Sequence, residues 1–116
     1  MEVNTGEVFL AHNKYMNPPK PKFHLCVSKD KYFLINTNPG HYTHLITPND
    51  CPLLHYDSYL NLTTVRVEPI KDFKIIKKEE LSKCCIEKII EKLKIVPSIP
   101  PIQKNEIIEA LKTCLL

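Results

Sequence analysis

The sequence predicts a single α+β domain, in which a small antiparallel β-sheet precedes C-terminal helices. Short segments rich in β-branched and aromatic residues, separated by proline- and glycine-containing turns, occupy residues 1–76. Two segments with apolar residues at helical spacing occupy residues 77–116. Short strands followed by helices are typical of α+β domains, so we expect a curved or barrel-like sheet.

Three strands are predicted before residue 38. The segment GEVFLAH (6–12) is apolar and β-branched, and FHLCVS (23–28) places its apolar and polar residues on opposite faces. The residues KDK then lead into YFLINT (32–37), which predicts a tight hairpin. The prolines of NKYMNPPKPK (13–22) remove backbone donors, so we expect a loop there. This loop carries Lys14, Lys20 and Lys22.

The middle of the chain predicts shorter extended pieces. Residues 38–44 contain the turn signal Pro39-Gly40, and prolines interrupt residues 45–60. Residues 61–70 alternate and predict a strand, and residues 73–76 predict one more short strand.

Two helices are expected at the end of the chain. Residues 77–95 carry an apolar stripe, with acidic residues in the first turn as the helix dipole favours. The prolines of residues 97–101 end this helix, and Asn105 would cap a second helix that runs through Cys114. We therefore expect residues 1–96 to form the sheet or barrel with its first helix. Residues 97–116 would be a proline-rich linker and an additional helix of the same domain.

Composition bounds the functional classes. The chain has 116 residues, the size of one domain, and a net charge of +3 in which Arg66 is the only arginine. This surplus permits contact with nucleic acid. No apolar run approaches the roughly 20 residues that span a bilayer, and the N-terminus lacks the pattern of a signal peptide, so we expect a cytoplasmic protein. The five cysteines lack the paired spacing of zinc ribbons or redox motifs, so we expect reduced thiols.

The stretch HYTHLITPNDCPLLHYDSYL (41–60) concentrates residues that could bind metal. A cysteine–histidine set can bind zinc tetrahedrally. The candidate ligands are loosely spaced, however, and Pro48 and Pro52 separate them. We therefore expect solvated loop histidines and no metal, with a metal-binding regulatory protein as an open alternative. The candidate ligands are His41, His44, Cys51 and His55.

Nucleophilic catalysis is weakly supported. Cys51 and His55 could form a thiolate pair, and Ser58 could join His55 and Asp57 in a triad. Triad members normally come from separate elements, because close neighbours in sequence rarely reach the required geometry. Only two glycines are present, so there is no glycine-rich phosphate loop.

The order of segments resembles the MazF/PemK family of toxin ribonucleases. GEVFL, a Pro/Lys loop, KFHLCVS, YFLINT, LLHYDSYLNLTTVRV and EELSKCCIEKIIEKL follow one another over residues 6–95. The resemblance implies a small SH3-like antiparallel barrel followed by a C-terminal helix, usually in a homodimer. It also implies an antitoxin protein as partner. The implied activity is cleavage of single-stranded RNA through the ribose 2′-OH, with no metal or cofactor.

The resemblance also assigns catalytic positions. Lys22 falls where the family has its catalytic arginine, and Asn36 and Thr37 fall where it has a Thr-Ser pair. Lysine lacks the bidentate fork of arginine, and asparagine cannot transfer a proton. His24 should share a strand face with Lys22, and its titration near neutrality would suit an acid or base.

Substrate contacts are expected around these positions. Aromatic and histidine rings in loops can stack on bases, and cations can bind phosphates. An alternative to the enzyme is a non-catalytic SH3-like module that binds protein or RNA. The expected substrate-binding residues are Lys14, Lys20, His41, Tyr42, His44 and Arg66.

Overall fold

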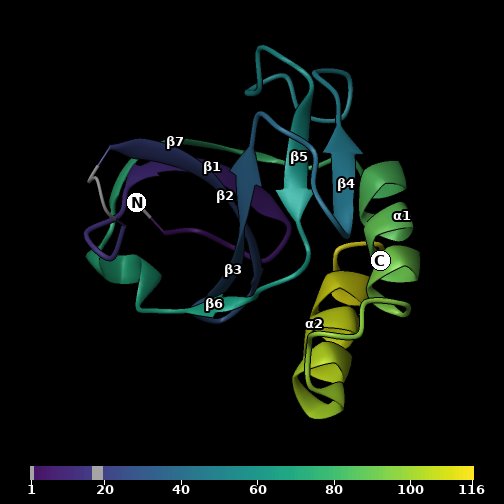
Figure 1. Cartoon of the computed structure of the whole chain (residues 1–116). Helices are drawn as coiled ribbons and strands as arrows, with labels where there is room; N and C mark the ends of the chain where they lie inside the picture. The colour runs from purple at the N-terminus through teal and green to yellow at the C-terminus, as the bar shows by residue number, and fades with distance from the viewer. Residues whose placement is uncertain (1, 17–19) are drawn as a thin grey trace.

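The computed structural model describes residues 2–16 and 20–116, which form seven strands, one short 3₁₀ helix and two α-helices (Figure 1). Residues 17–19 of the predicted loop lie outside this part. The elements are β1 (Glu7–His12), β2 (Pro21–Ser28), β3 (Lys31–Asn36), β4 (Thr43–Ile46), β5 (Ser58–Asn61), β6 (Arg66–Val67), η1 (Ile70–Asp72), β7 (Lys74–Glu80), α1 (Lys83–Leu93) and α2 (Pro101–Thr113).

The strands form one antiparallel sheet, which confirms the α+β class. Its order is β4-β5-β3-β2-β1-β7, and β6 pairs with β3 beside this path. The start of β3 pairs with β6, whereas its end pairs with β5. Strands β4 and β7 remain as the two edges, so the sheet among the described residues is open.

A tight hairpin joins β2 to β3, as the sequence predicts. Its turn holds Asp30 at a φ of 57°, a left-handed conformation that aspartate tolerates better than most residues. The Asp30 side chain also accepts a hydrogen bond from the Ile70 N–H at 3.1 Å, and its carbonyl accepts one from Glu68. The hairpin is thereby tied to the segment that precedes β7.

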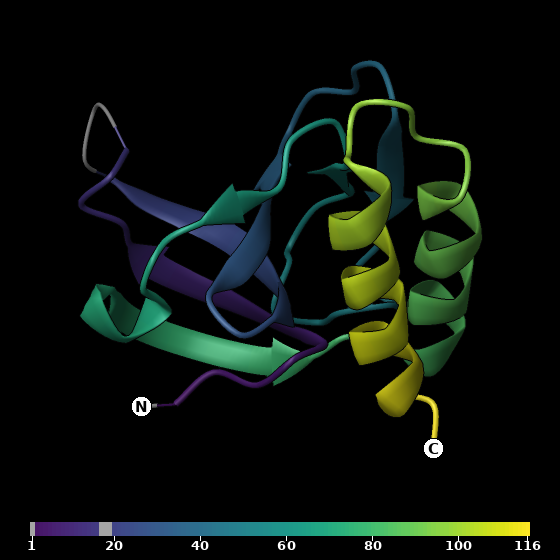
Figure 2. The ribbon, with the colours of Figure 1, turned by 90° about the horizontal axis from the view of Figure 1, so that it is seen from below.

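Both faces of the sheet bury apolar side chains. The first core cluster lies between the sheet and the helices and includes Leu25, Phe33, Ile89, Leu93 and Leu111. The second core cluster lies on the opposite face, where the sheet curls away from the two adjacent helices (Figure 2). Its buried members are Phe9, Ala11, Cys26, Tyr32, Ile70 and Phe73.

The predicted helix boundaries were wrong at both helices. Residues 77–80 belong to β7 and pair with β1, because long-range pairing overrides their local helical preference. Helix α1 begins after Ser82, whose side chain accepts a hydrogen bond from the Cys85 N–H at 3.2 Å. No acidic residue lies in its first turn. Helix α2 begins at Pro101, where proline at the first position suits a helix start, so Asn105 lies inside it.

Two strand predictions also needed correction. Within residues 61–70, Asn61 ends β5 and only Arg66–Val67 form a further strand, since the Asn61 side chain accepts the Thr63 N–H and turns the chain. Residues 73–76 are part of the longer strand β7. Strand β2 begins at Pro21, so Lys22 lies on a strand and not in a loop. Neither described helix has the length and apolar character needed to cross a bilayer.

Candidate functional site

Four neighbouring strands bring Lys22, Asn36, Tyr59 and Leu45 into one line across the sheet, the cross-strand row. Phe23 lies opposite Ile35, so Lys22 on β2 falls opposite Asn36 at the end of β3. Asn36 lies opposite Tyr59 on β5, and Tyr59 lies opposite Leu45 on β4. Directly opposed residues of antiparallel strands share a face, so the four side chains lie on the same side of the sheet.

The helices leave this face open. The residues next to the row, Ile35 and Leu60 among them, point to the first core cluster under the helices. Within the row Leu45 is 43% exposed, and the other three side chains are half-buried. In the part of the chain that the structure describes, no side-chain hydrogen bond or ion pair involves the Lys22 ammonium, the Asn36 amide or the Tyr59 hydroxyl. These polar groups are therefore available to a ligand.

A group of basic side chains adjoins the row where β1, β2 and β7 meet. We call His12, Lys14, Lys20, Lys22 and Lys74 the basic end. His12 lies opposite both Pro21 and Lys74, and Lys22 lies opposite Ala11, so the group spans both faces of the sheet at this end.

An exposed aromatic side chain, Tyr15, lies beside the basic end. Tyr15 is 39% exposed, and the Lys14 ammonium lies 5.3 Å from the centre of its ring. Asp72 supplies a carboxylate 3.8 Å from Lys14 at a solvent-exposed position, where an ion pair contributes little. The basic end thus keeps a positive field beside the cross-strand row.

His24 is closed to solvent. Its ring has no exposed surface and stacks on Phe9 with 4.7 Å between ring centres. Nδ1 lies 3.4 Å from the Phe9 carbonyl oxygen and Nε2 lies 3.4 Å from the Asn13 amide nitrogen, which suits a neutral ring protonated at Nδ1. The pKa of His24 is lowered from 6.5 to about 4, mainly by burial and also by the charges of Lys22 and Arg66, and two backbone hydrogen bonds oppose this shift. His24 shares the face of Lys22, as predicted, but a substrate cannot touch it.

Arg66 belongs to a polar network and not to the cross-strand row. Its Nε donates to the Tyr32 hydroxyl and to Glu68 Oε1, both at 3.0 Å, and a terminal nitrogen donates to Glu68 Oε2 at 3.1 Å. Tyr32 donates to Glu68 and accepts from the Asn13 amide at 2.8 Å. Arg66 lies opposite Tyr32, four residues along β3 from Asn36, which is about 13 Å at strand rise. Its charge is therefore compensated and distant from Lys22.

The remaining predicted residues are dispersed. Thr37 is exposed just after β3, and His41 and Tyr42 are exposed before β4. His44 lies opposite Leu60 and so faces the helices. Burial lowers the pKa of His44, and the charge of Lys92 lowers it further. The structure thus brings together Lys22 and Asn36 with Lys14 and Lys20 nearby, and separates the other predicted contacts.

In the histidine-rich stretch (41–60), the structure does not bring together the residues of the thiolate pair, the triad or the metal site considered above. Cys51 is buried, and burial raises the pKa of its thiol, whereas His55 is exposed. The Ser58 hydroxyl donates to the Tyr56 carbonyl at 3.0 Å, so it does not pair with His55 as a triad requires. Among residues 2–16 and 20–116, no group of three or more histidine, cysteine, aspartate or glutamate side chains could hold a metal ion.

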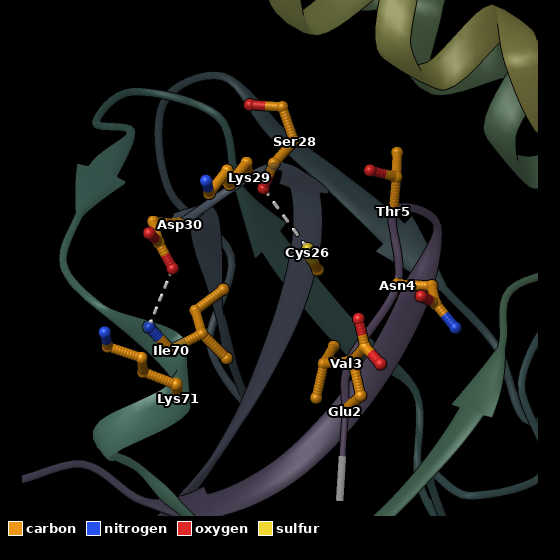
Figure 3. Close-up of a pocket in the computed structure, with 10 residues that line it drawn as sticks. All are labelled: Glu2, Val3, Asn4, Thr5, Cys26, Ser28, Lys29, Asp30, Ile70 and Lys71. Atoms are coloured by element: carbon orange, nitrogen blue, oxygen red, sulfur yellow. Dashed lines mark hydrogen bonds between the residues drawn. The ribbon is translucent and has the colours of Figure 1, made fainter.

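A cavity of about 870 Å³ opens on another part of the sheet, between residues 2–5, the β2–β3 hairpin and η1 (Figure 3). Cys26 lines it and donates its S–H to the Ser28 carbonyl at 3.4 Å. Burial raises the pKa of Cys26 to about 12, so the thiol stays protonated and unreactive. The figure shows the Ser28 hydroxyl directed away from Cys26. The cavity therefore offers a recess and no nucleophile.

The residues that sequence reasoning missed are Tyr59, Tyr15 and Asn13. Tyr59 enters the row only through the register between β3 and β5, and Asn13 only through its contacts with Tyr32 and His24. Tyr15 follows Lys14 in the sequence, and an aromatic ring next to a cation is a pattern that could have indicated a nucleic-acid contact. No known protein family has a sequence model that matches the chain, and no curated protein matches its sequence.

Proposed function

We propose that this chain is a single-stranded RNA-binding module, built on an open SH3-like fold, that does not cut RNA. The observation that carries the proposal is the continuity of the basic end with the cross-strand row, since Lys22 belongs to both. The resemblance to MazF/PemK ribonucleases agrees with RNA as the ligand, but the site geometry favours binding over cleavage.

The curvature of the sheet supports the SH3-like assignment. Strands β1, β2, β3 and β7 contribute residues to the second core cluster or its edge, and η1 adds Ile70 to it. A small sheet bent around its own core in this way is typical of partly open barrels. The helices pack outside this curl, as Figure 2 shows, and leave the open face free.

Phosphates and bases have separate contacts in this arrangement. The lysines of the basic end suit the phosphate backbone, which supplies most of the affinity in non-specific nucleic-acid binding. The exposed ring of Tyr15 and the half-buried ring of Tyr59 are aromatic groups on which unpaired bases can stack. Single-stranded RNA presents both groups, whereas the bases of a duplex are already stacked and paired.

Cleavage requires a group that accepts the proton of the 2′-OH and reaches it. His24 has no exposed surface and Arg66 is engaged by Glu68. Asn36 cannot transfer a proton. Lys22 can attract a phosphate, but a cation gives only part of the chemistry, and none of the predicted catalytic residues supplies a base that a substrate can reach. A metal-independent endoribonuclease stays the second candidate, because Lys22 and Asn36 lie opposite each other on neighbouring strands.

Binding and cleavage can be measured on one sample. A fluorescein-labelled mixed-sequence single-stranded RNA would be titrated with the protein in EDTA and then run on a denaturing gel. We expect binding that weakens steeply with added salt and RNA that stays intact. Lys20→Ala and Lys22→Ala should each weaken binding and lower the salt dependence by about one unit of slope.

The matched control is Lys88→Ala, which removes an exposed lysine on helix α1 away from the basic end. It should bind as the wild type does. If Lys88→Ala weakens RNA binding as much as Lys22→Ala does, RNA binds to the positively charged surface in general and the proposed site is refuted. If the wild type cuts RNA in EDTA, the enzyme reading replaces the binding module.

A further inference from the structure

We propose that Asn36, Tyr59 and Leu45, the base site, hold one unpaired nucleobase beside a phosphate on Lys22. This inference rests on the proposed function and deepens it, since it names the part of the RNA that each residue contacts. Figure 1 shows β3, β5 and β4 next to one another, and their register places these three side chains in sequence across the face.

The base site combines the two interactions that an unpaired base needs. Tyr59 lies directly opposite both Asn36 and Leu45, so its half-buried ring has an amide on one side and an exposed apolar side chain on the other. An aromatic ring offers a stacking platform that tolerates every base. The Asn36 amide offers one acceptor and two donors, which match the edge of a base whose own donors and acceptors are free.

The lack of internal partners is the second observation. Among the described residues the Asn36 amide, the Tyr59 hydroxyl and the Lys22 ammonium make no side-chain hydrogen bond or ion pair. Other polar side chains on the same face, such as Tyr32 and Glu7, are hydrogen-bonded within the fold. The side-chain polar groups of Lys22, Asn36 and Tyr59 are thus left for a ligand to satisfy.

The spacing assigns the phosphate to Lys22. Neighbouring strands lie about 4.8 Å apart, so Lys22 and Tyr59, with Asn36 between them, are separated by about 10 Å at the backbone. A base on Tyr59 therefore leaves the backbone of an adjoining nucleotide within reach of Lys22. Lys20, two residues before Lys22 in the sequence, supplies a second cation for a neighbouring phosphate.

The backbone of the base site is rigid. Asn36 and Tyr59 lie on paired strands, and β5 is paired on both sides, with β3 and with β4. Sites built on paired strands hold their side chains more closely than sites on loops. The geometry is therefore preformed, and binding requires no ordering of this segment.

The test separates base contacts from phosphate contacts. A short labelled single-stranded RNA, the same RNA with abasic nucleotides, and inorganic polyphosphate would be titrated with the wild-type chain and its variants. We expect abasic RNA to bind about tenfold more weakly than intact RNA, the scale of losing a stacked base. Tyr59→Ala should weaken binding of intact RNA by a similar factor and leave binding of polyphosphate unchanged.

Conservative and control substitutions separate the loss of an RNA contact from a loss of folding. Tyr59→Phe preserves the ring and should bind intact RNA nearly as well as the wild type. Tyr56→Ala removes an aromatic ring that is 76% exposed in the loop before β5 and should have no effect. Asn36→Ala should weaken binding of intact RNA but not of abasic RNA.

The outcomes distinguish this inference from the proposed function. If intact and abasic RNA bind equally, the base site fails while RNA binding stands. If Tyr59→Phe is folded, as judged by circular dichroism, and still loses as much RNA affinity as Tyr59→Ala does, ring stacking is also refuted. If the wild type binds no RNA at all, the proposed function fails first.

Discussion

Replacing His24 with phenylalanine should remove most of the acid sensitivity of the fold. Burial holds the pKa of His24 at about 4 in the folded chain, against 6.5 for an unperturbed histidine. Below pH 6.5 the unfolded chain therefore binds a proton that the folded chain does not take up until about pH 4. Stability is complete above pH 6.5 and falls as the pH drops through this window.

The magnitude follows from the shift. By pH 5 this linkage costs about 2 kcal/mol of unfolding free energy, and over the whole window about 3 kcal/mol. The variant His24→Phe keeps the stack on Phe9 but leaves the Phe9 carbonyl and the Asn13 amide without this partner. That loss costs about 1–3 kcal/mol at neutral pH. The variant should thus be less stable near pH 7 and lose less as the pH falls.

Urea unfolding followed by circular dichroism, between about pH 4.5 and 7.5, measures both effects. His55→Phe, at an exposed position, is the control and should keep the wild-type pH dependence. His44 leaves a smaller dependence in every variant, because burial lowers its pKa too. If the stability of His24→Phe falls with pH as steeply as that of the wild type, His24 is not buried in its neutral form. The argument against a catalytic role for His24 would then be wrong.

Three further predictions concern the chain termini, the helix start and the thiols. Gly6→Ala should destabilise the fold by at least about 1 kcal/mol, because Gly6 has a φ of 88° and an added Cβ would lie 2.8 Å from the Cys114 sulfur; an unchanged melting temperature would contradict this. Ser82→Ala should cost about 1 kcal/mol in urea titrations through loss of the bond from the Cys85 N–H. Iodoacetamide should modify the exposed Cys84 well before Cys85, as peptide mass spectrometry would show; equal rates would refute the helix orientation.

The hairpin and the helical stripes were readable from local patterns, whereas the β7–α1 boundary was not. Alternation in residues 23–28 reports strand geometry directly, and β2 and β3 confirm it. The residues KKEE (77–80) favour helix by composition, and only their pairing with β1 makes them a strand. Such pairing depends on contacts about 70 residues apart, which no local window contains.

The candidate site was readable only in part, for the same reason. Lys22 and His24 share a face, as alternation predicts, but alternation cannot tell that the second face of the sheet is also buried. The burial of His24 depends on Phe9, Asn13 and Tyr32, which come from other elements. Alternation therefore suggested that His24 could act as an acid or base beside Lys22, whereas the fold buries it on the face of the second core cluster.

The most direct test of the account is to map bound RNA on the ¹⁵N-labelled chain by NMR. Titration with a short single-stranded RNA in EDTA should shift the resonances of Lys22, Asn36 and Tyr59 together, leave those of helices α1 and α2 unchanged, and leave the RNA uncut. Shifts confined to the helices, no shifts at all, or appearance of cleaved RNA would contradict a binding module whose site is the cross-strand row.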